Sequence, residues 1–399
     1  MTLVNKSDRG WVNWIWQQQH AVRDVRDLKH YFTNVPGSFF DRLHNDRLKF
    51  QVTPYLLSQI PEDITQGKLE RDPFFLQFFP LGQLYTEGHD SYDGTDNWEK
   101  SEERPTKNLQ HKYTNRVVVR FRQCFGYCNF CFESLGTLEK RPSDDKLFLW
   151  GDWEKSLDYI RTHPEIEEVI LTGGEPLLVS NARLEQILSD LSSMKNSDGA
   201  SKVKFKRIHT RVMTFNPYRV DDKLIELIKD YSVNEIALNV AHPLEITSEF
   251  EDAVGKIREG TGKNMPLLVA HTPLLKGVND DTEILWELFS KLYSLNVKPY
   301  YLLHSMPHVP YADQQRVSVR GGVRLLKPLW RTKSHIALPE YVIVHYDGKH
   351  TVPLELNGTP EFRYTKDGFL GIFGNPIVKF LNWKGNWVEY PDVNDPRKD

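Results

Sequence analysis

Short segments rich in β-branched residues alternate with amphipathic segments from residue 116 to about residue 303, and this alternation limits the folds open to the chain. Strands separated by amphipathic helices pair in parallel and form β-α units. Six such units are too few for a closed eight-stranded barrel, so we predict an α/β fold built on an open, partial (β/α)6 barrel of the TIM type. In such a barrel the functional residues lie on loops that follow the C-terminal ends of the strands. Strands are predicted at residues 116–122, 168–172, 204–210, 235–240, 267–272 and 297–303, and helices at residues 182–194, 221–231 and 281–295.

Two further regions flank the predicted barrel, which we place at residues 108–310. Residues 1–107 are expected to be mainly helical, because apolar residues recur there at helical spacing, and residues 86–107 are expected to be a polar surface connection. Residues 311–399 are expected to form a small α+β appendage over the barrel mouth, with one strand near residues 338–344 and short strands in the last forty residues. The apolar residues at helical spacing are Trp11, Trp14, Trp16, Val22, Val25 and Leu28.

The chain has only three cysteines, and all of them lie within eight residues, on the loop that directly follows the first predicted strand. Cys124, Cys128 and Cys131 have the spacing of thiolates that bind three irons of a [4Fe–4S] cluster and leave the fourth iron open. Zinc would need a fourth protein ligand or a water, and His111 and His163 are too far along the chain to complete a local zinc motif. Buried cysteines without a ligand would not be grouped in this way. We therefore predict an iron–sulfur cluster at this loop.

The cysteine motif resembles that of the radical S-adenosylmethionine (SAM) superfamily, which also favours an aromatic residue at the position of Phe130. The resemblance implies that SAM binds the open iron, and two groups of residues that end predicted strands are candidates to hold it. The first group, a Gly-Gly-Glu sequence, would let the backbone approach SAM closely and would bind its ammonium group. The second group, a threonine and an arginine, offers a hydroxyl and a guanidinium. A Gly-Gly-Glu sequence can also be a simple turn, and an arginine a structural ion pair. The candidates are Gly173, Gly174 and Glu175, followed by Thr210 and Arg211.

Six sequence blocks, which begin at Thr53, Gln110, Leu171, His242, Leu274 and Lys298, match a known family in order and approximate spacing. Together they resemble the lysine 2,3-aminomutase family, over roughly residues 10 to 390. That family combines radical SAM chemistry with pyridoxal phosphate (PLP), so the resemblance implies PLP as a further cofactor. Its contacts with the PLP phosphate fall on Lys112, Tyr113 and Arg116, and two cations and a phenol suit a phosphate dianion. The lysine that binds PLP covalently falls on Lys349, in the expected turn 346–350.

Three features depart from that family. Glu133 stands where the family has an arginine that binds the α-carboxylate of the substrate, and two carboxylates repel each other unless one is protonated. Met306 and Val344 stand near the positions of two aspartates that bind the distal amine of lysine, so L-lysine is not the expected substrate. No cysteine follows Cys131, so the zinc site of the family, and with it the family's tetramer, is not expected. The residues expected to face the substrate are Glu133, His271, His304 and Met306.

The resemblance implies an isomerase that uses the cluster to cleave SAM to a 5′-deoxyadenosyl radical. The radical would remove hydrogen from an amino acid or related amine other than L-lysine, and the amino group would then migrate to the adjacent carbon on PLP. Two alternatives remain open. One is a PLP-independent radical SAM dehydratase, deaminase or epimerase, and the other is a non-catalytic metal-binding scaffold, which would not need the residues that are candidates to hold SAM.

Composition limits the partners. The net charge is −3, so there is no basic excess that would indicate nucleic acid. No apolar segment is long enough to span a bilayer, and the N-terminus lacks the apolar segment of a signal peptide. Unpaired cysteines fit a reducing compartment, so we expect a cytoplasmic protein. Its expected partners are a small-molecule substrate and an electron donor such as flavodoxin or ferredoxin, and a homodimer is the family-based expectation.

Overall fold

The computed structural model describes residues 6–44, 49–82, 101–133, 148–307, 309–345, 348–365 and 376–394. Its central element is a nine-stranded sheet in which the strands stand side by side in chain order. Strands β2 to β8 run parallel, and β1 and β9 pair antiparallel at the two edges. The strands are β1 Leu109–Tyr113, β2 Arg116–Phe121, β3 Glu168–Gly173, β4 Phe205–Thr210, β5 Glu235–Asn239, β6 Leu267–Leu274, β7 Lys298–His304, β8 Glu340–His345 and β9 Gly348–Thr351.

The predicted parallel strands are confirmed, because β2 to β7 correspond in order to the six segments expected from the sequence. The structure adds a seventh parallel strand, β8, which is the strand predicted at residues 338–344. The sheet is therefore a partial TIM-like barrel of the predicted α/β class, extended by two strands from the C-terminal region. Residues 83–100, which include most of the predicted surface connection, and residues 346 and 347 of the expected turn lie outside the described residues.

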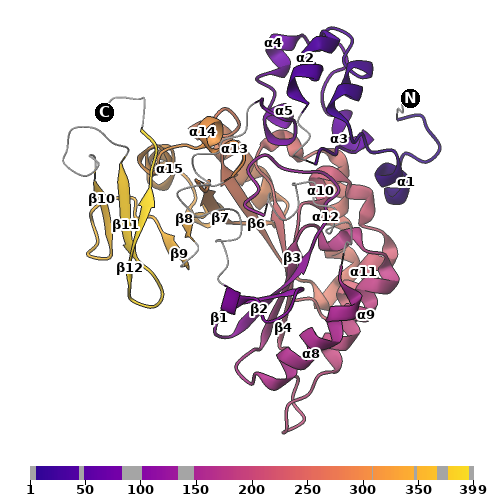
Figure 1. The fold of residues 1–399 in the computed structure, drawn as a ribbon, viewed down its shortest axis with the longest axis vertical. Helices are drawn as coiled ribbons and strands as arrows, with labels where there is room; N and C mark the ends of the chain where they lie inside the picture. Colours follow the sequence, from indigo (N-terminus) through magenta and orange to yellow (C-terminus); the bar gives the residue numbers. More distant parts are fainter. Residues whose placement is uncertain are drawn as a thin grey trace.

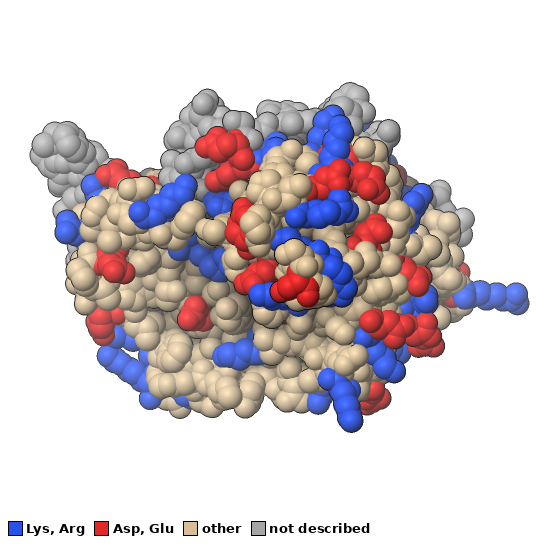
Figure 2. Space-filling model, turned by 90° about the horizontal axis from the view of Figure 1, so that it is seen from below, with Lys and Arg blue, Asp and Glu red and all other residues tan. Residues whose placement is uncertain are grey.

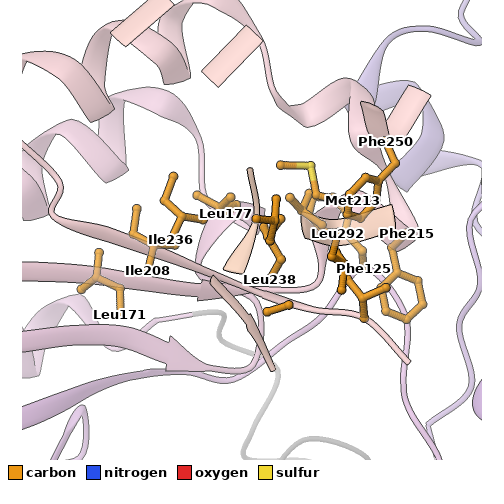
Figure 3. Close-up of a cluster of buried hydrophobic side chains, with 14 of the residues drawn as sticks. Phe125, Leu171, Leu177, Ile208, Met213, Phe215, Ile236, Leu238, Phe250 and Leu292 are labelled. Carbon is orange, nitrogen blue, oxygen red and sulfur yellow. The ribbon is translucent and has the colours of Figure 1, made fainter. Parts of the chain in front are cut away.

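Each strand divides its side chains between a core shared with the helices and the inner face of the sheet. In β2, Val117, Val119 and Phe121 are buried in that core, whereas Val118 between them lines an internal cavity. This follows from strand geometry, since successive side chains point to opposite faces. Figure 3 shows part of the core, in which strand residues meet residues of the neighbouring helices and loops, among them Leu171, Leu177, Ile208, Met213, Phe215, Ile236, Leu238 and Phe250.

Helices connect the parallel strands and pack outside the sheet (Figure 1). The three predicted helices are present as α9, α11 and α13, and each begins at a capping side chain. For example, Asp221 Oδ1 accepts a hydrogen bond from Leu224 N at 2.8 Å, and Asp281 Oδ1 accepts one from Glu283 N at 2.8 Å. Such caps satisfy backbone N–H groups that lack a partner in the first turn. The helices are α8 Trp153–Thr162, α9 Asn181–Ser193, α10 Val212–Phe215, α11 Asp222–Asp230, α12 Ser248–Thr261, α13 Thr282–Ser294, α14 Ala312–Gln315 and α15 Val319–Thr332.

Short helices of the N-terminal region pack against the loop that carries the cysteines. Trp14 meets Phe125 of this loop edge to face, with ring centroids 6.3 Å apart. Aromatic pairs favour this arrangement because the ring edge is positive and the face negative. The helical character predicted for this region is confirmed in its described part, where the helices (indigo in Figure 1) are α1 Trp14–Gln19, α2 Gly37–Leu43, α3 Pro54–Leu57, α4 Gln66–Leu69 and α5 Pro73–Phe78.

A second, three-stranded antiparallel sheet lies beside the main sheet (yellow in Figure 1). Tyr390 joins the two sheets, because its hydroxyl lies 2.7 Å from His304 Nδ1 and donates to Ser305 O at 3.0 Å. Arg316 Nη2 also donates to Pro391 O at 2.7 Å. The short strands expected near the C-terminus are confirmed as β10 Phe362–Thr365, β11 Ile377–Leu381 and β12 Trp387–Pro391.

The surface has charges of both signs. On the face drawn in Figure 2, acidic and basic side chains are interspersed, in keeping with a net charge of −3. Among the helices in the described part of the chain, none combines the length and the apolar character needed to cross a membrane.

The helix-facing core predicts the effect of truncating one of its members. Leu188 of α9 is fully buried in it, and removing most of this side chain leaves a cavity that the surrounding residues fill only in part. We expect Leu188→Ala to lower the free energy of unfolding by about 2–5 kcal/mol, measured by urea denaturation. The neighbouring exposed Ser189 provides the control, since Ser189→Ala should change that free energy by less than about 0.5 kcal/mol. Equal effects of the two substitutions would contradict this description of the core.

Candidate active site

The inner face of the partial barrel encloses a cavity of about 340 Å³. All three cysteines border it, together with inward-facing residues of the parallel strands. A volume of this size suits a small ligand. The lining residues that the strands contribute are Gln110 of β1, Val118 of β2, Ile170, Thr172 and Gly173 of β3, His209 and Thr210 of β4, Asn239 of β5, His271 and Pro273 of β6, Leu303 and His304 of β7 and Val344 of β8.

Side chains and backbone of the N-terminal region hold the cysteine loop in place. Gln51 Nε2 donates to Cys124 O at 3.1 Å and to Phe125 O at 2.8 Å. Asn129, between the second and third cysteines, donates from its backbone N to Gln77 O at 2.8 Å and from Nδ2 to Phe79 O at 2.6 Å. Sequence analysis did not identify Gln51 or Gln77. The only signal near either was the block that begins at Thr53, two residues after Gln51.

The thiols lie in surroundings that disfavour an isolated thiolate. Burial and the two other cysteines raise the pKa of Cys124 well above its usual value. Burial also raises the pKa of Cys128, although Arg211 Nη1, which donates to Cys128 Sγ at 3.2 Å, acts in the opposite direction. A positively charged metal centre would remove this cost, because thiolates are its ligands. The donor set therefore fits an iron–sulfur cluster.

The described residues contain no group of three or more His, Cys, Asp or Glu side chains placed to bind one metal ion. A [4Fe–4S] cluster does not require such convergence, since each cysteine binds a separate iron.

Gly173 and Gly174 let the loop after β3 pack directly on the backbone that leads to Cys124. Gly173 has a φ of +94°, a conformation that side chains rarely allow. A Cβ atom on Gly174 would lie 2.8 Å from Gln123 N and closer still to Gln123 O. Gly174 N donates to Phe121 O at 2.6 Å, and Glu175 N donates to Gln123 O at 2.7 Å. The sequence suggested that these glycines let the backbone approach a ligand closely. They also let two segments of the protein backbone approach each other.

Glu175 is buried and its carboxylate is held by three donors. Thr210 Oγ1 donates to it at 2.7 Å, Arg211 N at 2.9 Å and Leu177 N at 3.0 Å. Burial raises the pKa of Glu175 to about 7, against the effect of these hydrogen bonds. Thr210 Oγ1 in turn accepts from Val212 N at 3.0 Å. The structure therefore brings Glu175 and Thr210 together, as the sequence predicted, and their contact with SAM stays a prediction.

Arg211 forms the buried ion pair that the sequence left open as an alternative. Its Nη2 donates to Glu245 Oε2 at 3.1 Å and also to Gln77 Oε1. Its guanidinium carbon lies 4.7 Å from the ring centre of Phe78 and 4.9 Å from that of Phe130. Cations are attracted to aromatic faces at such distances. Arg211 thus links the cysteine loop to α5 and to the loop after β5.

Lys349 lies where β9 joins the sheet, paired in register with Val344, which lines the cavity. Its Nζ donates to Tyr301 Oη at 2.6 Å. The Lys349 side chain is exposed overall, but partial desolvation of its amine and the nearby charges of Arg116 and Arg207 lower its pKa to about 8. The expected turn is in part a strand, because Lys349 itself belongs to β9.

The predicted phosphate-binding residues lie on and just after β1. The Arg116 guanidinium stacks on the Tyr113 ring at 4.2 Å, and Arg116 is close enough to Lys349 to lower its pKa. Lys112 Nζ lies 3.8 Å from Glu103 Oε2. The structure therefore brings Arg116 and Tyr113 into the neighbourhood of Lys349, as the resemblance implied, and their contact with a phosphate stays a prediction.

A charge network that sequence analysis missed lies near Lys349. Arg207 of β4 donates to Glu168 Oε1 at 2.7 Å and to Glu235 Oε1 at 2.6 Å, and so joins β3, β4 and β5. The signal was the alternation in β4, where Arg207 and His209 are half-buried between the buried residues Lys206, Ile208 and Thr210. Charged residues at inward-facing strand positions require partners, which neighbouring strands supply.

The two predicted histidines both border the cavity but differ in their partners. His271 is buried, and its Nε2 has no hydrogen-bond partner among the described residues. Such an orphan atom beside a cavity fits a role in holding a ligand. His304, by contrast, uses both ring nitrogens within the protein, since Nε2 lies 2.8 Å from Val317 O and Nδ1 contacts Tyr390. Burial lowers the pKa of His304 to about 3.

Glu133 forms an ion pair with Arg120 of β2. Glu133 borders the cavity and is almost completely buried. The partner of this carboxylate is thus a guanidinium of the protein itself. A buried ion pair in this position neutralises the negative charge of Glu133.

The cavity, the cysteine loop at the end of the first parallel strand and the glycines after the second define a radical SAM enzyme. The comparison with known families agrees, since residues 118–286 match the family described as the Radical SAM superfamily. Membership implies a [4Fe–4S] cluster and SAM as cofactors, and the cysteine donor set described above fits the cluster.

Comparison with curated proteins identifies the particular family. The chain is 31% identical over 380 residues to a protein of Aquifex aeolicus whose name gives it as a candidate L-lysine 2,3-aminomutase, covering 94% of this chain and 96% of that protein. It is 28% identical to the L-lysine 2,3-aminomutase of Methanococcus maripaludis, covering 98% and 84%. It is 26% identical to the glutamate 2,3-aminomutase of Clostridioides difficile, covering 98% and 85%. The chain belongs to the lysine 2,3-aminomutase family of radical SAM enzymes.

The backbone contact at Gly174 predicts that an added methyl group disturbs the cysteine loop. We expect Gly174→Ala to destabilise the protein by about 1–3 kcal/mol or more, because the Gln123 backbone has to move. Since Cys124 follows Gln123, the variant should also bind less iron and sulfide after anaerobic reconstitution. Gly255 of α12 is the control, because a Cβ atom there meets nothing within 4 Å. Normal iron content in Gly174→Ala would contradict the proposed role of this contact.

Proposed function

We propose that this chain is a PLP-dependent radical SAM aminomutase whose substrate is an amino acid or related amine other than L-lysine. The observation that carries the proposal is Lys349, an amine with a lowered pKa beside the inner face of the barrel. Arg116 and Tyr113, which suit a phosphate, lie in its neighbourhood. The unpartnered Nε2 of His271 adds a polar atom beside the same cavity.

The cofactors supply a radical that removes hydrogen from the substrate and a ring system that holds the migrating nitrogen. The residues of the chain position both. Neutral Lys349 is a nucleophile that can bind the PLP aldehyde, and Tyr301 orients its amine through their hydrogen bond. Arg116 and Lys112 supply the positive charge for the phosphate. The cluster is held by Cys124, Cys128 and Cys131. Glu175 lies next to these cysteines and binds the ammonium group of SAM.

We propose a substrate other than L-lysine because of the residues at the positions expected to contact the substrate. Met306 and Val344 carry no charge that could bind a distal ammonium group. Glu133 is paired with Arg120, so it too is committed to a partner within the protein.

We also propose that the protein is cytoplasmic, with flavodoxin or ferredoxin as electron donor and a homodimer as its assembly. A reducing compartment would protect the cluster, and a small redox protein would deliver the single electron that SAM cleavage consumes.

Substitution of Lys349 tests the role of PLP. The purified, reconstituted protein should carry PLP that borohydride reduction fixes to the peptide containing Lys349, as detected by mass spectrometry. Lys349→Ala should lose this modification and the matching absorbance in difference spectra, while its iron content stays unchanged. Lys384→Ala, at an exposed lysine of the C-terminal sheet, should keep both. A protein that binds its cluster and SAM but no PLP would instead support the PLP-independent dehydratase, deaminase or epimerase.

The lowered pKa of Lys349 predicts how PLP uptake depends on pH. The amine is protonated and unreactive below its pKa and becomes a nucleophile above it. Because this pKa is about 8, the initial rate of PLP uptake by the apoprotein should rise as the pH increases through about 8 and then level off. The rate is measured by borohydride trapping at a series of pH values. A rate that keeps rising tenfold per pH unit well above pH 9 would indicate an ordinary lysine with a pKa near 10.5.

A further inference from the structure

The lining of the cavity differs between the first and the last parallel strands. The cysteines follow β2 and Glu175 follows β3, whereas Met306 follows β7 and Val344 lies on the adjacent strand β8. We call Met306 and Val344 the apolar end of the cavity. Met306 is 4% exposed and packs with Val309 and Ala312 in an apolar cluster that Val344 completes. The side chains of Met306 and Val344 therefore offer a ligand only van der Waals contact and the exclusion of water.

The apolar end adjoins the residue that would hold the substrate nitrogen. Val344 and Lys349 are direct partners in the antiparallel pair β8–β9. Side chains of directly opposed residues lie on the same face of a sheet. A molecule whose nitrogen replaces Lys349 on the bound group lies beside Lys349 and can therefore extend its own side chain over Val344 toward Met306.

Of the ionisable side chains in the described lining, three have partners within the protein, whereas His271 on β6 keeps an unpartnered Nε2. Glu133 is paired with Arg120, Arg211 with Glu245, and both ring nitrogens of His304 have partners in the protein. Ser305 Oγ, next to Met306 in the chain, is buried without a hydrogen-bond partner among the described residues. A neutral hydroxyl does not compensate a full charge. A charged group placed against Met306 and Val344 would thus lose its water without gaining an ionic partner from Glu133, Arg211 or His304.

We propose that the substrate is an amino acid with an uncharged, aliphatic side chain, and that Met306 and Val344 select it. This inference rests on the proposed function, because it assumes that Lys349 carries the group that binds the substrate nitrogen. It goes further in naming the chemical class of the substrate and the two residues that discriminate.

L-norleucine and L-lysine are matched probes, because norleucine has the side chain of lysine without the distal amine. The reconstituted holoenzyme with SAM and PLP is titrated with each amino acid, and with L-glutamate, in the absence of reductant. We expect norleucine to bind at least about tenfold more tightly than either charged amino acid. With dithionite, norleucine should also give the highest rate of 5′-deoxyadenosine formation. Tighter binding of lysine or glutamate would overturn the inference.

Introducing a carboxylate tests the two residues directly. Met306→Asp and Val344→Asp should each shift the ratio of lysine to norleucine affinity toward lysine by about tenfold or more. Two variants are used so that misfolding of one leaves the other informative, and iron and PLP contents report whether each is intact. Met265→Asp, at a methionine that is 49% exposed, is the matched control and should keep the preference for norleucine. An unchanged ratio in both intact variants would contradict the assignment of these residues.

The same experiment separates this inference from the proposed function. Absence of PLP from Lys349 in the wild-type protein overturns the proposed function and the inference together. PLP on Lys349 combined with a preference for a charged amino acid overturns the inference alone.

Discussion

The close backbone contact between Gly173-Gly174 and the residues before Cys124 is the constraint on which the site depends. Gly174 N and Glu175 N donate to the carbonyls of Phe121 and Gln123, so the ends of β2 and β3 are joined just beyond their ladder. The absence of a side chain at Gly174 makes this approach feasible. The contact places the cysteine loop and the Glu175 carboxylate at the same end of the barrel.

Buried polar side chains extend this contact across the molecule. Glu175 binds Thr210 and the backbone of Arg211, and the Arg211 side chain reaches Glu245 and Gln77. Each charge in the chain of contacts has a partner, as burial requires. The network joins three strand ends and an N-terminal helix, so the cluster loop cannot shift without breaking several hydrogen bonds. Such preorganisation keeps reactive groups in place.

Sequence patterns predicted the parts of the fold that depend on local periodicity. The six parallel strands and the helices α9, α11 and α13 follow from alternating and helical spacing of apolar residues. The pairing of β8 with β7 was not predicted, because a strand after a long break in the pattern carries no local information about its neighbour. Gln51, Gln77 and Arg207 were likewise missed, since a single polar residue does not reveal a partner that lies far away in the chain.

The sequence alone determined the chemistry of this protein: three cysteines in one loop, glycines and a glutamate after the next strand, and the order of the blocks that mark the aminomutase family. These are properties of short segments, so they can be read without coordinates. Only the tertiary structure decided which partners Glu133, His304 and Lys349 have. These partners are Arg120, Tyr390 and Tyr301 respectively, and each comes from a different strand. The charge and availability of a buried group depend on what surrounds it in space, which the order of residues does not state.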